Sequence, residues 1–415
     1  MWAALERYFD IKGRGSSVGR ELRGAVATFL TMAYILVANP AILKQAQVPQ
    51  ESAVACTALA AGLCCVLMGL WANFPIALAS GMGLNAVVAY QVAEASGSWQ
   101  IAMGVVVLDG VVVFVFVLSG LREAMLQAIP LDLRRAIGAG IGLFIAFIGA
   151  VNAGIVKADT VPGKPVKAGS LAEPEAALAV AGLLVMAVLL ALRVRGAIVL
   201  GILFGTVVAL LCGMSKLPEG LSPPSFEIIG RADVLGALQL SLLPFLFTLV
   251  LVDFFDTLGT VTAIAEQSGL HDERGNIPGL RRVLLADAVS ASVGGVCGVS
   301  SVTSYIESAA GVAEGARTGL HSVFVGLFFL VAILLAPLAA IVPAAATAPA
   351  LILVGFLMCE QIVRIDFGRR DTAIPAFVTL VTLPTTWSIT HGIGYGFLTY
   401  CTFPDRLEFS LKLLD

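Results

Sequence analysis

The chain has 415 residues, of which 58% are hydrophobic and only 13% are charged, and its mean hydropathy is +0.95. This composition carries more apolar surface than a water-soluble domain, so it predicts an integral membrane protein. The net charge of -3 and the scattering of basic residues between apolar runs argue against nucleic-acid binding. The seven Cys residues include no CxxC pair, so we expect neither disulfides nor a metal cluster.

A helix that crosses the hydrocarbon core of a bilayer needs roughly 20 apolar residues. The sequence holds fourteen candidate segments, which predict an all-α, polytopic membrane protein. Amphipathic stretches at 121–129 and 226–238 predict connecting helices along the membrane surface. The segments lie at 24–46, 52–73, 75–93, 99–119, 133–155, 174–193, 196–214, 237–265, 281–298, 300–316, 318–341, 344–364, 371–388 and 390–405.

The third and tenth segments differ from the others because Gly, Ser and Thr interrupt their apolar runs. The third contains Ser80-Gly-Met-Gly-Leu-Asn85, and the tenth contains Val302-Thr-Ser-Tyr-Ile-Glu307. Non-helical backbone at membrane depth must face protein or a water-filled cavity. Two interrupted segments at matching places in two halves therefore predict a substrate site near the middle of the membrane.

The polar connection at 215–236 divides the segments into two halves of seven, a first repeat at 24–214 and a second at 237–405. Because seven is odd, the second half enters the membrane from the opposite side, and the halves form an inverted repeat if they share a fold. Most Lys and Arg residues fall on the side of the basic N-terminal stretch. We therefore expect both termini in the cytoplasm.

Acidic side chains at membrane depth are costly to bury and tend to line a cavity. Glu307 in the tenth segment is the leading candidate, together with Asp253 and Asp256 in the eighth. These two aspartates are three residues apart, so they share a face of a helix, and Thr257 and Thr260 extend that polar face. At least one aspartate of the pair is expected to be functional.

The remaining polar residues in apolar segments have structural interpretations. Asp109 and Asp287 are interpreted as hydrogen-bonding partners between helices. Glu314 is expected to form an ion pair with the nearby Arg317 at the end of the tenth segment. The three His residues show no metal-ligand spacing, and no nucleophile–base pair is apparent. We therefore expect no enzyme, no metal and no cofactor.

The candidate residues carry hydrogen-bonding groups that can frame the edge of a planar heterocycle. An ionised carboxylate such as Glu307 can accept two adjacent N–H groups of a nucleobase, whereas the Asn85 amide both donates and accepts. Burial disfavours the charged form of a carboxylate, so a proton can enter together with the substrate, and we hypothesise proton symport. The candidates for the proton-coupling group are Glu307, Asp256 and Asp253. Further candidates for the cavity lining are Thr31, Thr257, Thr260, Ser304 and Tyr305.

Two alternatives remain open at the level of single residues. Glu307 can be a structural carboxylate satisfied by the hydroxyls of Ser304 and Ser308, and a buried Asn85 can simply join helices. At the level of function, the alternative is an anion or other small-solute transporter of the same fold. Such a transporter would not need central carboxylates, so Glu307 and the aspartates argue against an anionic substrate.

Four motifs, in the right order along essentially the whole chain, resemble the AzgA-like purine permeases of the nucleobase:cation symporter type 2 superfamily. They are Ala27-Thr-Phe-Leu-Thr-Met-Ala-Tyr-Ile35, Gly81-Met-Gly-Leu-Asn-Ala86, Asp253-Phe-Phe-Asp-Thr-Leu-Gly259 and Thr303-Ser-Tyr-Ile-Glu-Ser-Ala-Ala-Gly311. The resemblance implies uptake of hypoxanthine, guanine or adenine by alternating access, generally with protons. It places the binding roles on Asn85, Asp253, Asp256 and Glu307.

The resemblance also implies an architecture within the single membrane domain of residues 1–415. Fourteen segments form two inverted repeats, and short strands in segments three and ten meet at the substrate. A core domain comprises 24–119 and 237–341, and a gate domain comprises 120–236 and 342–405. A homodimer is frequent in the family, and the cell (inner) membrane is the expected location.

One position departs from the family pattern. Many members carry aromatic residues just after the Asn-Ala pair, where this chain has Val87 and Val88. A ring that stacks on the base would then have to come from elsewhere, for example from Phe254 or Tyr305. The preferred base is therefore left open by the sequence.

Overall fold

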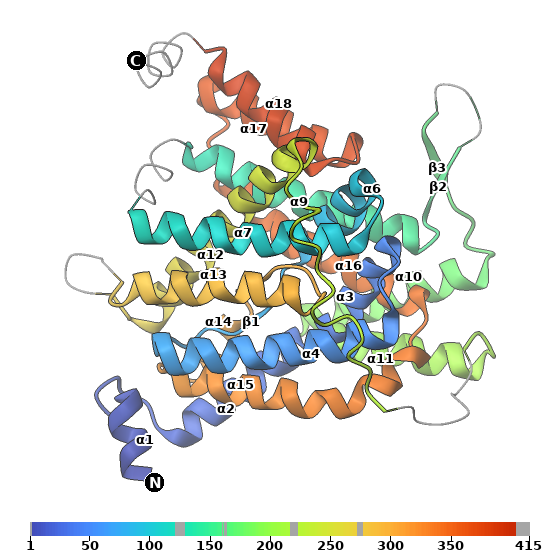
Figure 1. The fold of residues 1–415 in the computed structure, drawn as a ribbon. Helices are drawn as coiled ribbons and strands as arrows, with labels where there is room; N and C mark the ends of the chain where they lie inside the picture. The colour runs from blue at the N-terminus through green and yellow to red at the C-terminus, as the bar shows by residue number, and fades with distance from the viewer. Residues whose placement is uncertain are drawn as a thin grey trace.

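The computed structural model describes residues 2–120, 129–159, 161, 164–215, 223–271 and 277–403. Long helices, most of which run in nearly the same direction, form the molecule (Figure 1). Eight helices within these ranges are long and apolar enough to cross a membrane, and α11 is a shorter apolar helix. The predicted all-α, polytopic fold is confirmed.

The elements of the first half follow one another in this order: α1 (Trp2–Phe9), α2 (Val18–Met32), α3 (Ile35–Leu43), η1 (Lys44–Ala46), α4 (Gln50–Leu67), η2 (Met68–Ala72), β1 (Leu78–Ser80), α5 (Met82–Val87), η3 (Val88–Val92), α6 (Ala93–Ser96), α7 (Trp99–Ser119), α9 (Leu131–Asn152), β2 (Val156–Ala158), β3 (Val166–Ala168), α10 (Pro174–Ala191) and α11 (Ala197–Leu211).

The second half contains η4 (Leu240–Leu242), α12 (Leu243–Ser268), α13 (Leu280–Val296), β4 (Val302–Ser304), α14 (Ser308–Ala313), α15 (Gly319–Ala332), η5 (Ile333–Ile341), α16 (Ala344–Cys359), η6 (Glu360–Arg364), α17 (Arg370–Thr385) and α18 (Ile389–Cys401).

Each of the fourteen predicted segments corresponds to one helix or to one group of consecutive short elements. The first segment begins at Val18, earlier than predicted, because the Ser17 side chain caps α2 by accepting a hydrogen bond from the Arg20 N–H. It is also divided, since the chain leaves the helix at Ala33–Tyr34 between α2 and α3. The hairpin formed by β2 and β3 has no counterpart among the predicted elements.

The third segment of each half contains the predicted strand. β1 and β4 pair in an antiparallel register, with Leu78 opposite Ser304, Ala79 opposite Thr303 and Ser80 opposite Val302. All six residues are buried, so the non-helical backbone lies inside protein, as chain at membrane depth requires. Antiparallel pairing of equivalent strands is the arrangement expected for two inverted halves.

The helices pack as two groups. In the first, α7 contacts α13, α13 contacts α4, α4 contacts α15 and α15 contacts α2, and Figure 1 shows α7, α13, α4 and α15 side by side. In the second, α9, α10 and α11 pack on α16, and α17 packs on α9 and α18. Apart from the start of α2 at Val18, the helices of the first group come from the predicted core ranges (24–119 and 237–341) and those of the second from the predicted gate ranges (120–236 and 342–405). These domain bounds, and movement between the groups, stay predictions.

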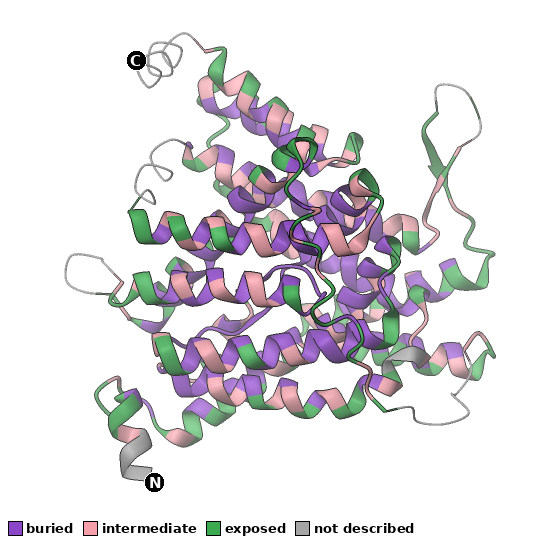
Figure 2. Ribbon diagram, viewed as in Figure 1, coloured by how far each residue is buried: buried purple, intermediate pink, exposed green. Residues whose placement is uncertain are grey.

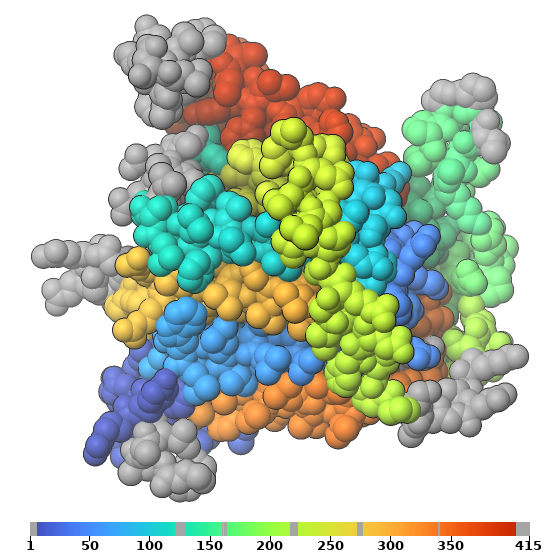
Figure 3. Space-filling view, in the orientation of Figure 1, coloured from blue at the N-terminus to red at the C-terminus, as the bar shows by residue number. Residues whose placement is uncertain are grey.

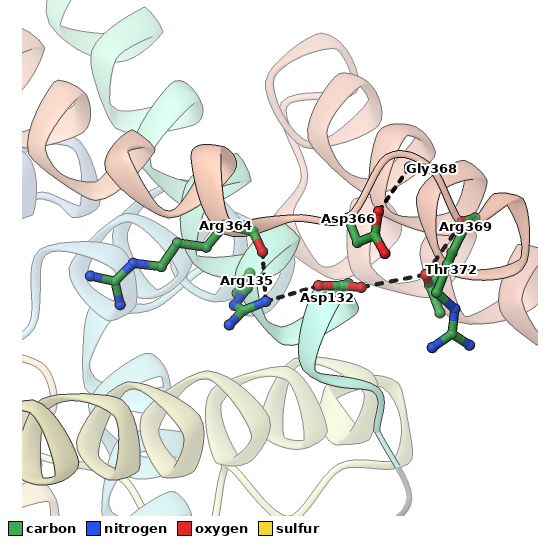
Figure 4. A network of polar contacts seen from close by, with 7 residues as sticks. All are labelled: Asp132, Arg135, Arg364, Asp366, Gly368, Arg369 and Thr372. Atoms are coloured by element: carbon green, nitrogen blue, oxygen red, sulfur yellow. Dashed lines mark hydrogen bonds and ion pairs between the residues drawn. The ribbon is translucent and has the colours of Figure 1, made fainter.

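A polar network joins the helix ends of the second group (Figure 4). The Arg135 guanidinium contacts the Asp132 carboxylate at 3.0 Å and donates to the Arg364 carbonyl at 2.6 Å. The Thr372 hydroxyl donates to the same aspartate at 3.4 Å, and Asp366 accepts from the Gly368 N–H at 2.9 Å. The network thus links α9 of the first half to η6 and α17 of the second half.

Facing glycines let helices of the two halves approach closely. A Cβ atom added at Gly142 of α9 would lie 2.6 Å from the Gly355 carbonyl oxygen, and one added at Gly355 of α16 would lie 2.3 Å from the Gly142 oxygen. Gly62 of α4 and Gly326 of α15 face each other in the same way, at 3.1 and 2.6 Å. Such small-residue contacts are a common basis for helix association in membranes.

The connection between the halves corrects one prediction. Residues 226–238 form turns and irregular chain rather than a surface helix, and Figures 1 and 3 show this segment crossing the outer surface of the first group. Its backbone N–H groups bond to other elements, with Gly230 donating to the Val296 carbonyl and Asp233 to the Gln100 carbonyl, both at 2.8 Å. These partners replace the bonds within a helix. The other predicted surface helix, 121–129, lies almost entirely outside the described residues.

Burial follows the membrane interpretation, since the centre of the molecule is buried and the outer faces are exposed (Figure 2). The exposed faces are apolar on helices such as α10 and α11, where Leu184 and Leu203 are 61% and 53% exposed. Of the free cysteines, only Cys212 and Cys401 are exposed in the described part of the chain. Cys212 follows the end of α11, and Cys401 ends α18.

Candidate functional site

The broken first segment brings Tyr34 to the predicted acidic residue of the tenth segment. Tyr34 lies at the break between α2 and α3 and is buried, and its hydroxyl donates to Glu307 Oε1 at 2.9 Å. Glu307 directly precedes α14 and is half-buried. The bond fixes one carboxylate oxygen of Glu307 and leaves the other free of a side-chain partner within the described residues.

Asp256 lies on α12 close enough to Glu307 for the two carboxyl groups to interact electrostatically. Asp256 and Gly259, one helical turn apart, are exposed, and Ile306 beside Glu307 is 50% exposed. This side of α12 and the start of α14 therefore lie at an exposed surface of the described structure. The structure thus brings Asp256 and Glu307 together at an accessible place.

Asn85 is completely buried at the start of the helical part of the third segment. Its Oδ1 accepts from the Ser80 hydroxyl at 2.7 Å, and the same hydroxyl is within bonding distance of the Val299 carbonyl. Its Nδ2 has no partner among the described residues. A buried donor without a partner is costly, so this N–H group is a candidate for binding, although Asn85 is as fully enclosed as Asp253.

Asp253 does not share the environment of Asp256. Asp253 is 0% exposed, and both of its carboxylate oxygens lack hydrogen-bond partners among the described residues. It interacts electrostatically with Asp109 of α7 and Asp287 of α13. The expected common polar face of α12 is therefore divided, with Asp253 turned into the helix packing and Asp256 turned to the opening.

Asp287 joins three elements behind the strands, which confirms its interpretation as a helix-bonding residue. Its carboxylate accepts from the Thr257 hydroxyl at 2.6 Å and from the Ser304 hydroxyl at 2.7 Å. Thr257 is also 2.8 Å from the hydroxyl of Thr303 in β4. Asp109, by contrast, has no hydrogen-bond partner in the described part of the chain.

The predicted lining residues lie in different surroundings. Thr257, Ser304 and Thr260 are buried, and the first two are held by Asp287. Thr31 is half-buried, and its hydroxyl donates to carbonyls of its own helix. Tyr305 is 6% exposed, and its hydroxyl donates to the Ser80 carbonyl at 2.5 Å. A role in lining the cavity stays a prediction for all five.

The two proposed sources of a stacking ring differ in position. Phe254 is 2% exposed inside a cluster with Val113 of α7 and Ala288 of α13, so its ring is not available to a solute. Tyr305 lies next to the open region and remains a candidate. A separate cavity of about 610 Å³ beside Tyr90, bounded by residues 45–47 and 89–100, includes none of the predicted site residues.

Two contacts between the helix groups involve residues that sequence analysis did not connect. Glu314 forms its ion pair with Arg195, between α10 and α11, and not with Arg317, which donates to the Val312 and Ala316 carbonyls. The prediction of a local pair was wrong because the fold brings a more distant guanidinium to the end of α14. A sequence signal for this long-range partner is absent.

The second contact lies at the end of η3. Gln91 Oε1 accepts from the Ser388 hydroxyl at 3.1 Å and from the Thr390 N–H at 3.3 Å. Next to it, the ring centroids of Tyr90 and Trp387 are 6.2 Å apart, and the Trp387 ring also packs on the ring of Phe144. The third segment of the first group is thus held against the α17–α18 turn of the second.

Comparison with known proteins decides the family. A model described as the Permease family matches residues 19–394 of the chain. The chain belongs to this family. The permease is therefore a multi-pass membrane transporter, and its resemblance to nucleobase permeases is confirmed.

Relatives match the permease along almost its full length. It is 38% identical over 400 residues to adenine permease AdeP of Escherichia coli (strain K12), covering 96% of this chain and 89% of that relative. It is 38% identical over 411 residues to guanine/hypoxanthine permease PbuG of Bacillus subtilis (strain 168), covering 95% and 93%.

A solved structure confirms the fold of the permease. The transmembrane domain of the cyanobacterium bicarbonate transporter BicA superposes with a TM-score of 0.64 at 15% sequence identity, covering 91% of this chain and 97% of that one. Two inverted halves of seven segments, with core and gate domains, are therefore the architecture of the permease. At this identity the likeness concerns the fold alone.

Proposed function

We propose that this permease takes up purine nucleobases together with protons by an alternating-access mechanism. The observation that carries the proposal is the placement of Asp256 on α12 and of Glu307 at the start of α14, because these two helices contact each other beside the paired strands. Support also comes from relatives named for adenine and for guanine and hypoxanthine, which match almost the whole chain. The finer points, proton coupling and the choice of base, rest on the chemistry of the site.

The site offers the groups that a purine edge requires. A purine presents ring N–H donors next to ring nitrogen or carbonyl acceptors along its edge. With one Glu307 oxygen held by Tyr34, the other can accept a ring N–H, and Asp256 can accept a second. The unpartnered Asn85 Nδ2 can donate to an acceptor on the same ring once a movement of the enclosing chain exposes it.

Proton coupling follows from the charge of the site. Carboxylates at membrane depth are expensive to keep ionised, so a proton that enters with the neutral base lowers the cost of moving the loaded site. We also propose that the termini are cytoplasmic, that the permease resides in the cell (inner) membrane, and that it can form a homodimer. Substrate binding by Asp253, which the sequence favours, is less well supported than binding by Asp256, because Asp253 is enclosed.

The test is an uptake panel in cells that lack their own nucleobase permeases. Labelled adenine, guanine, hypoxanthine, xanthine and uracil are supplied with and without a protonophore, and bicarbonate uptake is measured in parallel. We expect saturable uptake of at least one purine and its loss with the protonophore. Uptake of no base would remove the nucleobase proposal, and bicarbonate uptake alone would favour the anion transporter. Purine uptake that is insensitive to the protonophore would contradict the proposed proton coupling.

A further inference from the structure

Three carboxyl groups that the purine site does not need lie together between α7, α12 and α13. Asp109 and Asp253 are 0% exposed and Asp287 is 2% exposed. The helices are close here, since a Cβ atom added at Gly110 would lie 2.6 Å from the Ala288 carbonyl oxygen. Asp109 directly precedes Gly110, and Asp287 directly precedes Ala288, so this contact brings the two aspartates into one region. Asp253 reaches it from α12, one turn before Thr257, which bonds to Asp287.

The cluster of Asp109, Asp253 and Asp287 lacks compensating positive charge. None of the ion pairs in the described part of the chain involves these residues. The groups that act on them electrostatically are one another and Asp256, and from α4 the Cys64 thiol faces Asp287. All are acidic.

The nearest basic groups point elsewhere. Arg134 of α9 lies over the Phe255 ring at 5.4 Å, and Phe255 is turned about 200° around α12 from Asp253. Arg281 donates to the Leu118 carbonyl at the ends of α13 and α7. Glu307 of the tenth segment acts on Asp256 and not on the cluster. No guanidinium or ammonium group among the described residues thus neutralises the cluster.

A proton is the ligand that fits this arrangement best. A buried carboxylate without a partner is so unfavourable that the group becomes neutral instead. Both oxygens of Asp109 and both of Asp253 lack a partner at hydrogen-bond distance among the described residues, and the Thr303 hydroxyl is the neutral group that acts on Asp253. The three carboxyl groups lie near enough to interact electrostatically, but no three His, Cys, Asp or Glu side chains in the described ranges converge on one point to hold a metal ion.

We propose that Asp109, Asp253 and Asp287 form a second acidic site, separate from the purine-contacting carboxylates, which binds the coupling proton. The inference rests on the proposed proton symport and deepens it. A proton from water on one side forms an O–H bond with a cluster carboxylate. That bond breaks when the proton is released to water on the other side, and no oxidant or reductant takes part.

A chain of hydroxyls connects the cluster to the purine site. The Thr257 hydroxyl contacts both Asp287 and the Thr303 hydroxyl, and Ser304 of β4 donates to Asp287. Thr257 directly follows Asp256, which faces the opening. A change of charge in the cluster would therefore alter the hydrogen bond from Ser304 of β4 to Asp287, while the base would contact the same segment at Glu307.

The inference is tested with Asp109→Asn in the full-length permease reconstituted in liposomes. Two assays use labelled adenine or hypoxanthine, whichever the native permease carries. The first measures exchange with equal unlabelled purine on both sides, and the second measures accumulation driven by a pH gradient. We expect Asp109→Asn to retain exchange and to lose accumulation, because purine contacts remain while the proton site is altered. Asp109→Glu, which restores an acidic group, is expected to regain accumulation.

Each other result has a defined meaning. Accumulation by Asp109→Asn at the native level would overturn the inference while leaving the symport intact. Loss of both activities in folded protein, or an Asp109→Glu variant as impaired as Asp109→Asn, would show a packing role only and also overturn it. Failure of the native permease to accumulate purine would instead remove the proposed coupling. Glu51→Gln, an exposed carboxyl at the start of α4, is the matched control and should keep both activities.

If Asp109→Asn yields no folded protein, the native permease supplies the measurement. Purine-induced infrared difference spectra should contain the carbonyl stretch of a protonated carboxylic acid. Glu307→Gln should leave a part of this band, because the cluster lies apart from Glu307. Complete absence of the band from the native spectrum would overturn the inference.

Discussion

At the scale of single residues, position around one helix separates Asp253 from Asp256. Their spacing places them on neighbouring rows of α12, about 60° apart around the helix axis. The packing of α7 and α13 covers one row completely, whereas the other faces the opening beside α14. The sequence could predict that α12 carries a polar face. Which polar residues of that face are enclosed and which are accessible depends on α7, α13 and α14, which lie elsewhere in the chain.

Glu307→Gln tests the proposed acceptor of the purine N–H. The amide keeps the size of the side chain and can still accept from Tyr34, but it loses the charge and one acceptor oxygen. Hydrogen bonds to charged groups contribute about 1.5–3 kcal/mol, so we expect purine affinity to fall at least about tenfold and uptake to be lost. The measurement is purine binding and uptake at equal membrane abundance.

Glu266→Gln is the control for this change. Glu266 is exposed near the end of α12, so neutralising it should leave uptake unchanged. Uptake by Glu307→Gln at the native rate would contradict the proposed role of Glu307. Impaired uptake in both variants would point to a general effect of lost negative charge.

At the scale of elements, close helix contacts hold the two halves together. Gly142 of α9 and Gly355 of α16 face each other. The space that a side chain would need at either glycine is occupied by the backbone of the other helix. The sequence shows these glycines but not which ones face a partner, because that depends on the crossing of two helices from different halves. The fourteen segments and the two interrupted ones were accessible from local pattern, since hydropathy and interruption by Gly, Ser and Thr are properties of a short stretch. The strand pairing was implied only by the resemblance to a family.

Two Gly→Ala changes with the same chemistry should have opposite effects. At Gly142 the added methyl would lie 2.6 Å from the Gly355 oxygen, so the helices must separate, at a cost of about 1–3 kcal/mol. At Gly394 of α18 nothing lies within 4 Å of the added atom, and Ala should favour the helix by about 0.5–1 kcal/mol. Thermal unfolding in detergent should show a lower midpoint for Gly142→Ala only. Equal midpoints would contradict the close contact of α9 with α16.

At the scale of the whole molecule, contacts join the two helix groups at separate places. Gln91 and Tyr90 meet the α17–α18 turn, and Glu314 pairs with Arg195 beyond the end of α14. None of these long-range contacts could be predicted from the sequence, because each joins residues more than a hundred positions apart. If one group moves against the other during transport, at least one of these contacts must break.

Cross-linking tests this movement. Gln91→Cys and Ser388→Cys are combined with Cys212→Ser and Cys401→Ser, and a short bifunctional methanethiosulfonate is added. We expect uptake to stop, because the link holds the third segment to the α17–α18 turn, and to return after reduction. Each single-Cys variant treated in the same way should keep its uptake. Undiminished uptake by fully cross-linked permease would show that the two groups do not separate here.

The exposed cysteines give the molecule built-in markers of its orientation. α11 ends toward the β2–β3 hairpin, whereas α18 ends beside the C-terminus on the opposite side (Figure 1). Cys212 and Cys401 are both exposed, so with the proposed cytoplasmic termini they would face opposite compartments. A maleimide that cannot cross lipid should modify Cys212 in intact cells and Cys401 only in inside-out vesicles. The reverse pattern would place the termini outside the cell.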